Sequence, residues 1–210
     1  RSQCSSLSSA KQWTTHFTGV GHERHGISGF TKREYQKDDP VGKKEAPDRK
    51  KLVNGSDIEV LTYPEILDSA GHSCGLINPL PLWPPLELKN GFCISGMLTP
   101  PESDRWVYPE DFADEVTEFG YEIDVQYGDR PYGFIDDDLF TESVSLAQMK
   151  EDMFRVLNTR IGFAKHMIEK RDLDLLYCLF KSMDIIQHAF WVHMANGHEE
   201  FSNCIYSCYR

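Results

Sequence analysis

Apolar and polar residues recur along this chain with two different periods, and the periods predict both helices and strands. The longest periodic stretch runs from Ser145 to Arg171, where apolar residues return every three or four positions, as on one face of a helix. Ser145 followed by Gln148 fits a capping box, so we expect the helix to begin there. The apolar stripe consists of Leu146, Met149, Met153, Leu157, Ile161, Ala164 and Ile168.

Short apolar runs between turn-forming residues predict strands. These runs cover residues 72–78, 92–96, 121–127 and 175–180. The run from Leu175 to Phe180 is apolar throughout, which is typical of a strand buried on both faces of a parallel sheet. Residues 121–127 alternate with period two, as a half-exposed strand does.

Helix starts and stops separate these predicted strands. Pro64 at a first helical position and Gly71 just past the end predict one helix, and the acidic stretch 108–116 predicts the start of another. The serines before Trp13 predict a third helix start, and Gly19 suits the left-handed position that closes a helix. Helices that alternate with strands predict an α/β layered fold, with a mainly parallel sheet between helices.

The chain is expected to form one domain over residues 1–210 that carries a polar surface insertion at residues 31–57. The insertion is rich in charge and poor in apolar residues, so a solvated loop is expected, with a basic flap over a phosphate site as the alternative. The chain opens on Arg1 and closes in a stretch that fits part of a helix. We therefore expect a piece of a longer protein, with a fold incomplete at both ends.

Net charge and cysteine usage indicate which classes of partner and which cellular compartment to expect. The net charge of -11 argues against nucleic acid, because clustered lysine and arginine drive that binding. No apolar run approaches the roughly 18 residues of a membrane span, so no membrane partner is expected. The six cysteines are scattered, which predicts reduced thiols in the cytoplasm. Cys204 and Cys208, with His198 upstream, are an alternative metal site.

An acid and a histidine follow the apolar run 175–180. Asp184 lies where the strand would emerge, and open α/β sheets bind ligands outside the carboxyl ends of their strands. His188 follows at i, i+4, so both side chains would share one helix face and could share a cation. The alternative is that Asp184 is a helix N-cap and His188 a bystander. The run Asp136–Asp138 predicts a solvated turn, since three adjacent acids cannot easily face one ion.

Three segments resemble the alkaline phosphatase superfamily, in its type I phosphodiesterase/nucleotide pyrophosphatase branch, which includes predicted phosphohydrolases and phosphomutases. Residues 9–20, SAKQWTTHFTGV, and residues 25–27, HGI, resemble its nucleophile segment. Residues 184–191, DIIQHAFW, look like its metal-ligand segment, and residues 79–100 are similar to the stretch between them. The resemblance runs over most of the chain, from Ser9 to Trp191, and implies an alkaline-phosphatase-like fold.

The resemblance also implies which residues carry the chemistry. Ser9 falls where the family has its threonine or serine nucleophile, which also touches one of two divalent metal ions. Asp184 and His188 fall where it has two ligands of the other ion. The family suggests zinc, and these ligand types also suit manganese. A cation is needed because a hydroxyl is a poor nucleophile at neutral pH, and two metals stabilise both the attacking and the leaving oxygen. A shift of one residue would make Ser8 the nucleophile instead.

The expected activity is hydrolysis of a small-molecule phosphate ester, nucleotides included, through a covalent phosphoserine on Ser9. The family's first acidic ligand precedes the nucleophile, and its Asp-His pair and last histidine follow the region present here. The activity is therefore expected of the full-length parent and is expected to be weak in this piece. Lys11 and Gln12 depart from the small or proline residues of the family. The alternatives are a non-catalytic or truncated relative that binds a partner, and a sulfatase or phosphomutase of the same superfamily.

Overall fold

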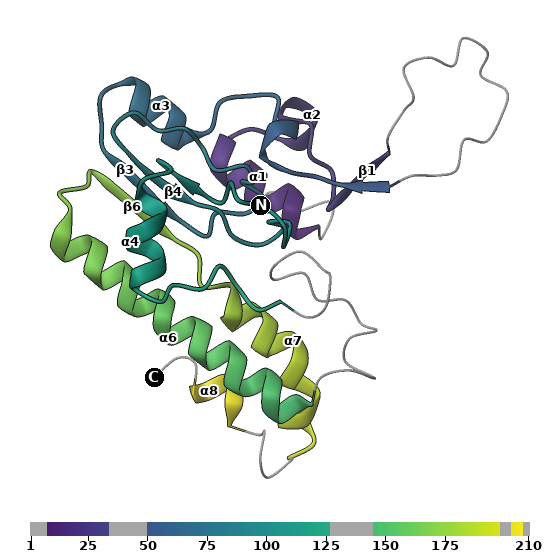
Figure 1. The fold of residues 1–210 in the computed structure, drawn as a ribbon. Helices are drawn as coiled ribbons and strands as arrows, with labels where there is room; N and C mark the ends of the chain where they lie inside the picture. Colours follow the sequence, from purple (N-terminus) through teal and green to yellow (C-terminus); the bar gives the residue numbers. More distant parts are fainter. Residues whose placement is uncertain (1–7, 34–49, 127–144, 198–202, 208–210) are drawn as a thin grey trace, which may run out of the picture.

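The structure is a computed structural model that describes residues 8–33, 50–126, 145–197 and 203–207 (Figure 1). Within these residues a four-stranded sheet has the order β5-β4-β3-β6. Its strands are β3 (Cys74–Ile77), β4 (Gly91–Ile94), β5 (Val107–Tyr108) and β6 (Leu175–Cys178). β3 pairs in parallel with both β4 and β6, and β5 adds antiparallel to β4. The predicted mainly parallel sheet is confirmed.

Helices cover both faces of this sheet (Figure 1). On one face lie α1 (Ser9–Thr18) and α3 (Tyr63–Ser69), and on the other lie α4 (Phe112–Glu118) and α6 (Leu146–Lys170). Alternation along the strands supplies the two cores, because successive side chains point to opposite faces. In β3, Leu76 packs in the cluster of Phe17, whereas Ile77 packs in the cluster of Phe163. The fold is thus a mixed α/β layered arrangement.

β6 differs from the expectation of a strand buried on both faces. The strand exists and is parallel, yet all four residues from Leu175 to Cys178 are only half-buried. The reason is its position at the edge of the described sheet, where β3 is its neighbour. An edge strand has a partner on one side, so solvent reaches side chains that a central strand would bury.

The long predicted helix is confirmed as α6. The Ser145 hydroxyl accepts a hydrogen bond from the backbone N–H of Gln148 at 3.1 Å, as the cap predicted. The half of α6 nearer its N-terminus packs against α7 (Lys181–Ala195) and α8 (Cys204–Ser207) in a core separate from the sheet. The stripe does not extend to Ile168, which is 65% exposed. The buried face of α6 also contains a charged residue, Arg160, which is fully buried.

Residues 121–126 do not form the predicted strand. Tyr121, Ile123 and Val125 are buried as a period-two pattern requires, but Asp124 is buried as well. Arg160 explains why this segment is ordered without a partner strand, because its guanidinium donates to the carbonyl of Ile123 and to the hydroxyl of Tyr121. A buried side chain thus meets the hydrogen-bonding needs that a neighbouring strand would otherwise meet.

The three predicted shorter helices are confirmed as α1, α3 and α4, with small changes of boundary. The Gly19 residue closes α1 at φ 68°, and Thr62 with Glu65 forms a capping box at the start of α3. The insertion was expected to be a loop, but its described parts form an antiparallel pair, β1 (Thr31–Arg33) with β2 (Lys50–Leu52), followed by a short 3-10 helix, η1 (Gly55–Asp57). A short helix, α2 (His22–His25), follows α1.

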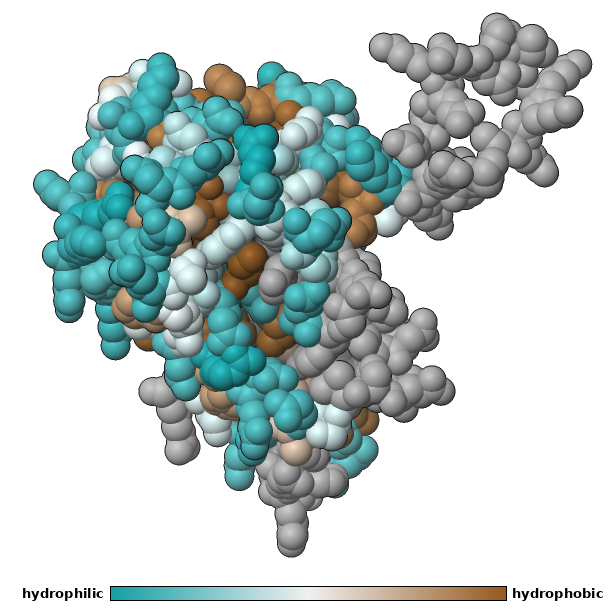
Figure 2. Space-filling model, in the orientation of Figure 1, coloured by the Kyte–Doolittle hydropathy of each residue, from teal (hydrophilic) through white to brown (hydrophobic). Residues whose placement is uncertain are grey.

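Several predictions lie outside the described residues: the centre of the insertion, the turn at Asp136–Asp138, and His198 and Cys208 of the alternative metal site. Among the described residues, Cys74, Cys93 and Cys178 carry thiols outside any disulfide. Burial raises the pKa of the Cys93 thiol to about 12, so the protonated form is favoured at neutral pH. Of the helices described, none is both long and apolar enough to cross a membrane. The face in Figure 2 is mostly polar, with apolar side chains in separate small areas.

Candidate active site at the carboxyl ends of the parallel strands

A cavity of about 280 Å³ lies where α1, α7 and the carboxyl ends of β3 and β6 meet. The residues that line it are Ser9, Trp13, Leu80, Leu179, Phe180, Lys181, Met183, Asp184 and Gln187. Leu80 follows β3, and Leu179 follows β6, so both parallel strands point at this cavity. This is the edge at which open α/β sheets bind ligands.

Ser9 is the first residue of α1 and is exposed on the cavity. The buried side chains Ala10, Thr14 and Phe17 hold α1 on the rest of the protein, so they fix where its N-terminus lies. The first backbone N–H groups of a helix lack partners within the helix and favour negative charge. Ser9 therefore lies in a positive field, next to a space of the size of a small ligand.

Ser8 lies differently from its neighbour. It is the N-cap of α1, its hydroxyl makes no capping hydrogen bond, and it does not line the cavity. A Cβ atom built on Gly29 would meet the Ser8 Oγ at 3.7 Å, so that hydroxyl faces the loop after α2. Of the two adjacent serines, the structure brings Ser9 to the cavity.

Asp184 and His188 lie one turn apart on α7, as their spacing predicted. His188 Nε2 is 3.5 Å from Asp184 Oδ1, and the side chains are 72% and 54% exposed. Asp184 lines the cavity, whereas His188 lies outside it. Asp184 is in the first turn of α7 and the N-cap is Phe180, so the alternative in which Asp184 is the N-cap is wrong.

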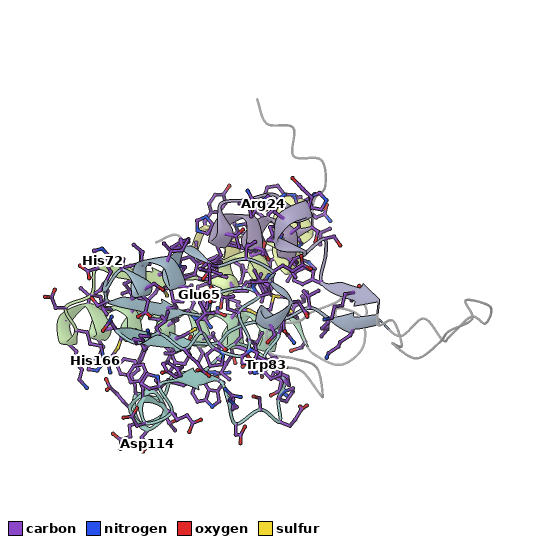
Figure 3. The ribbon with its side chains drawn as sticks, turned by 90° about the horizontal axis from the view of Figure 1, so that it is seen from above. Arg24, Glu65, His72, Trp83, Asp114 and His166 are labelled. Carbon is purple, nitrogen blue, oxygen red and sulfur yellow. The ribbon has the colours of Figure 1, made fainter. Side chains whose placement is uncertain are left out.

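The donor set of this pair fits a divalent metal ion. Two ligand atoms bound tetrahedrally to zinc lie about 3.4 Å apart, close to the observed separation. A carboxylate oxygen and an imidazole nitrogen are both common ligands of zinc and manganese. Within the described part of the chain, no three His, Cys, Asp or Glu side chains gather around one point. In Figure 3 the labelled side chains Glu65, His72, Asp114 and His166 lie apart from one another.

His25, from the HGI segment, has a structural position. It is fully buried at the end of α2, its Nδ1 accepts from the backbone N–H of Ile27 at 3.1 Å, and its Nε2 lies 3.1 Å from the Thr15 hydroxyl. Desolvation by burial lowers the pKa of His25, so the neutral ring is favoured. The histidine joins α2 to α1 and does not line the cavity.

Asn78 is a residue at this edge that sequence reasoning missed. It follows β3 with φ 57°, its Nδ2 donates to the Leu179 carbonyl at 3.0 Å, and its Oδ1 accepts from the Met97 backbone N–H at 3.1 Å. It therefore ties the ends of β3, β4 and β6 together just before α7 begins. A Cβ on Gly96 would lie 1.4 Å from the Asn78 Oδ1, so this position requires glycine. An asparagine directly after an apolar run and before a proline was the available sign, since Asn adopts left-handed backbone more readily than most residues.

A buried charged pair lies near this clamp. The side chains of Asp124 and Arg160 are both 0% exposed, with Oδ2 and Nη2 4.0 Å apart. Desolvation by burial raises the pKa of Asp124, and Arg160, Lys181 and Asn78 offset this only in part. Asp124 therefore feels the charge of a residue that lines the cavity.

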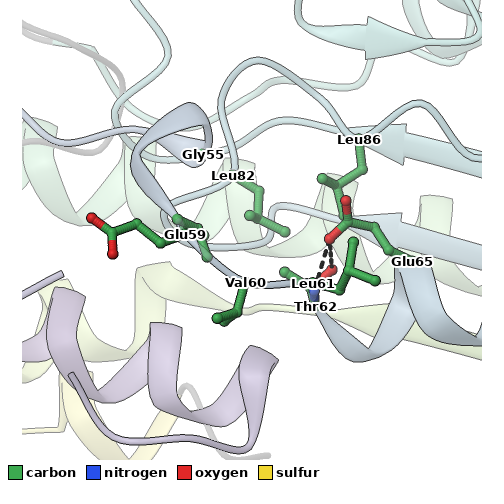
Figure 4. A pocket seen from close by; sticks show the side chains of 9 residues that line it. Gly55, Glu59, Val60, Leu61, Thr62, Glu65, Leu82 and Leu86 are labelled. Atoms are coloured by element: carbon green, nitrogen blue, oxygen red, sulfur yellow. Dashed lines mark hydrogen bonds between the residues drawn. The ribbon is translucent and has the colours of Figure 1, made fainter. Parts of the chain in front are cut away.

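A second cavity, of about 270 Å³, lies between η1 and α3 (Figure 4). Two carboxylates, Glu59 and Glu65, are among its lining residues, and Glu65 accepts hydrogen bonds of 2.7 Å from both the backbone N–H and the hydroxyl of Thr62. These bonds belong to the capping box of α3, so the Glu65 carboxylate serves a helix end.

Comparison with known proteins identifies no relative: no family model, no curated protein and no solved structure matches the chain. The mixed α/β fold with its mostly parallel sheet stands on the structure itself.

Proposed function

We propose that this chain carries the nucleophile and part of the metal site of a phosphohydrolase of the phosphodiesterase/nucleotide pyrophosphatase type, with an alkaline-phosphatase-like fold. One observation carries the proposal: Ser9 and Asp184, which are far apart in sequence, line the same cavity. The family resemblance assigns these two residues to one active site, and the cavity brings them to one place at the carboxyl edge of the sheet.

In the proposed reaction, the Ser9 hydroxyl attacks the phosphorus of a phosphate ester. A bond forms between Ser9 Oγ and phosphorus, the bond from phosphorus to the leaving oxygen breaks, the serine proton passes to solvent, and the leaving oxygen takes a proton from solvent to become the alcohol. Water then hydrolyses the phosphoserine and restores the hydroxyl. The N-terminal backbone N–H groups of α1 favour the negative charge on the phosphoryl oxygens in both steps.

Asp184 Oδ1 and His188 Nε2 would hold one divalent ion, zinc or manganese, and Ser9 Oγ would contact the other. Bound there, the ions would lower the proton affinity of the serine and stabilise the attacking and leaving oxygens. The proposal places the remaining ligands on residues other than those described.

The lining of the cavity favours a small-molecule ester that has an apolar or ring-bearing group. Trp13, Leu80 and Met183 offer apolar surface beside the Ser9 hydroxyl. Aromatic side chains stack on flat rings, so the base of a nucleotide falls in this class. A local positive charge is needed to receive an anion, because the chain carries a net charge of -11.

The proposal is tested by metal content and by hydrolysis of a chromogenic phosphodiester, monoester and sulfate ester. The chain and any longer product of its gene are assayed after loading with zinc or manganese. Ser9→Ala should lower turnover by at least about a thousandfold without unfolding the protein. Ser8→Ala is the matched control and should retain turnover, because Ser8 faces away from the cavity.

Retained turnover in Ser9→Ala would exclude the serine as nucleophile. A complete protein that holds no metal and cleaves none of the esters would contradict the proposed function as a whole. Cleavage of the sulfate ester alone would favour a sulfatase.

A further inference from the structure

Lys181 is an unusual lining residue of the Ser9 cavity. It is the first residue of α7, its side chain is 13% exposed, and its ammonium contacts Asp184 Oδ2. Within the described chain, the other lysines in ion pairs lie far more open: Lys32 is 42% exposed and Lys170 is 49% exposed. Lysines are rarely so covered, because an ammonium is strongly hydrated.

We propose that Lys181 binds the phosphate group of the substrate in this cavity and rests on Asp184 until that group arrives. The identity of the anion as a phosphate ester rests on the proposed function above. The binding role of Lys181 rests on its own position, which neither the nucleophile nor the metal ligands determine.

The cavity places the ammonium where an anion would need it. Lys181 is the cationic side chain among the lining residues that the structure describes, and Ser9 with the N-terminus of α1 borders the same space. Lysine binds phosphate as a point charge that can donate three hydrogen bonds. The apolar walls, Leu80, Leu179 and Met183, limit the screening by water, so the attraction is stronger than at an open surface.

The Lys181 ammonium can exchange its contact with Asp184 for a contact with a phosphate group. Lys181 has a flexible four-carbon stem, so its ammonium can leave Asp184 without a shift of α7. Asp184 is 54% exposed, so water and cations reach its carboxylate once the lysine leaves. The same movement would free both carboxylate oxygens for the proposed metal site.

The test is binding of inorganic phosphate to the intact chain, measured by isothermal titration calorimetry without added metal. Lys181→Met should weaken phosphate binding by at least about tenfold, which is the contribution of one charge-assisted hydrogen bond. Lys181→Arg should keep the affinity within about threefold, because it retains the charge. Lys165→Met, on an exposed lysine of α6, is the matched control and should bind phosphate as the wild type does.

If circular dichroism shows that Lys181→Met does not fold, a second variant, Asp184→Asn, still tests the inference. Asp184→Asn removes the acid that competes for the ammonium, so it should tighten phosphate binding. The double variant Lys181→Met/Asp184→Asn, where it folds, should lose most of the gain in phosphate affinity that Asp184→Asn gives alone. Both substitutions change phosphate binding through the Lys181 ammonium. A wild type that does not bind phosphate, a Lys181→Met variant that binds it unchanged, or an Asp184→Asn variant without a gain would each overturn the inference.

The outcomes separate this inference from the proposed function. Loss of phosphate binding in Lys181→Met together with full turnover in Ser9→Ala would uphold the lysine and reject the nucleophile. Unchanged phosphate binding in Lys181→Met together with lost turnover in Ser9→Ala would do the reverse.

Discussion

Two pairs of an acid and a base lie on this molecule in opposite environments. Asp124 and Arg160 are 0% exposed, and the guanidinium also bonds Tyr121 and the Ile123 carbonyl. Asp184 and His188 are 54% and 72% exposed and lie beside a cavity. A buried pair cannot lose one member without leaving a charge in the interior, whereas an exposed pair adds little to stability. The first pair therefore belongs to the fold, and the second is available to a ligand.

Removal of the buried base is expected to have the largest effect. Arg160→Leu leaves Asp124 buried without its cation and the Ile123 carbonyl without its donor. We expect the free energy of unfolding, measured by urea denaturation, to fall by about 3–5 kcal/mol. Arg155→Leu, on a 51% exposed arginine of the same helix, is the control and should cost about 1 kcal/mol or less. Equal losses in the two variants would break the comparison.

Gly96→Ala tests the clamp that joins the fold to the cavity. The added Cβ would lie 1.4 Å from the Asn78 Oδ1, so the Asn78 side chain has to leave Met97 or Leu179. We expect a loss of about 1–3 kcal/mol in unfolding free energy, with weaker phosphate binding, because the start of α7 is no longer held. A variant with wild-type stability and binding would show that Asn78 does not position the site.

Glu115 is partly buried, between the two pairs in exposure, and its contribution to stability should depend on pH. Partial burial raises its pKa, but Lys170, Arg171 and His166 outweigh this and hold the pKa below the ordinary 4.5. A lowered pKa means that the ionised form stabilises the folded state at pH values above 4.5, and that this contribution is lost as the pH falls through the folded-state pKa. Glu115→Gln should therefore lower stability by up to about 1 kcal/mol at neutral pH. In urea unfolding at about pH 2 its difference from the wild type should vanish. A difference that persists in acid would assign the effect to packing.

The exposed pair is expected to have the smallest effect on stability. Asp184→Asn and His188→Ala should each change the unfolding free energy by about 0.5 kcal/mol or less, because water already reaches both side chains. Equilibrium dialysis should show weaker binding of zinc or manganese in both variants. A large loss of stability in either one would move this pair from the ligand site to the fold.

Local signals accounted for much of the architecture. Ser145, Gly19 and Pro64 stand at helix ends, where the needs of unpaired backbone groups select residue types directly. The apolar runs predicted β3, β4 and β6 for a similar reason, since a buried strand must be apolar. The strand prediction for residues 121–126 was wrong. Alternation with period two indicates which side chains are buried, but it does not specify what forms hydrogen bonds with the backbone.

The sequence by itself determined the long helix α6 and the strands β3, β4 and β6, and it placed Asp184 and His188 on one helix face, because these features depend on residues within one turn or one strand. Only the tertiary structure decided that β6 lies at an edge, that Arg160 is buried against Asp124, and that Ser9, rather than Ser8, shares a cavity with Asp184 and Lys181. Each of these depends on contacts between segments far apart in the chain, above all the pairing of β3 with β6. Such contacts are selected by the joint packing of all layers, which no local pattern encodes.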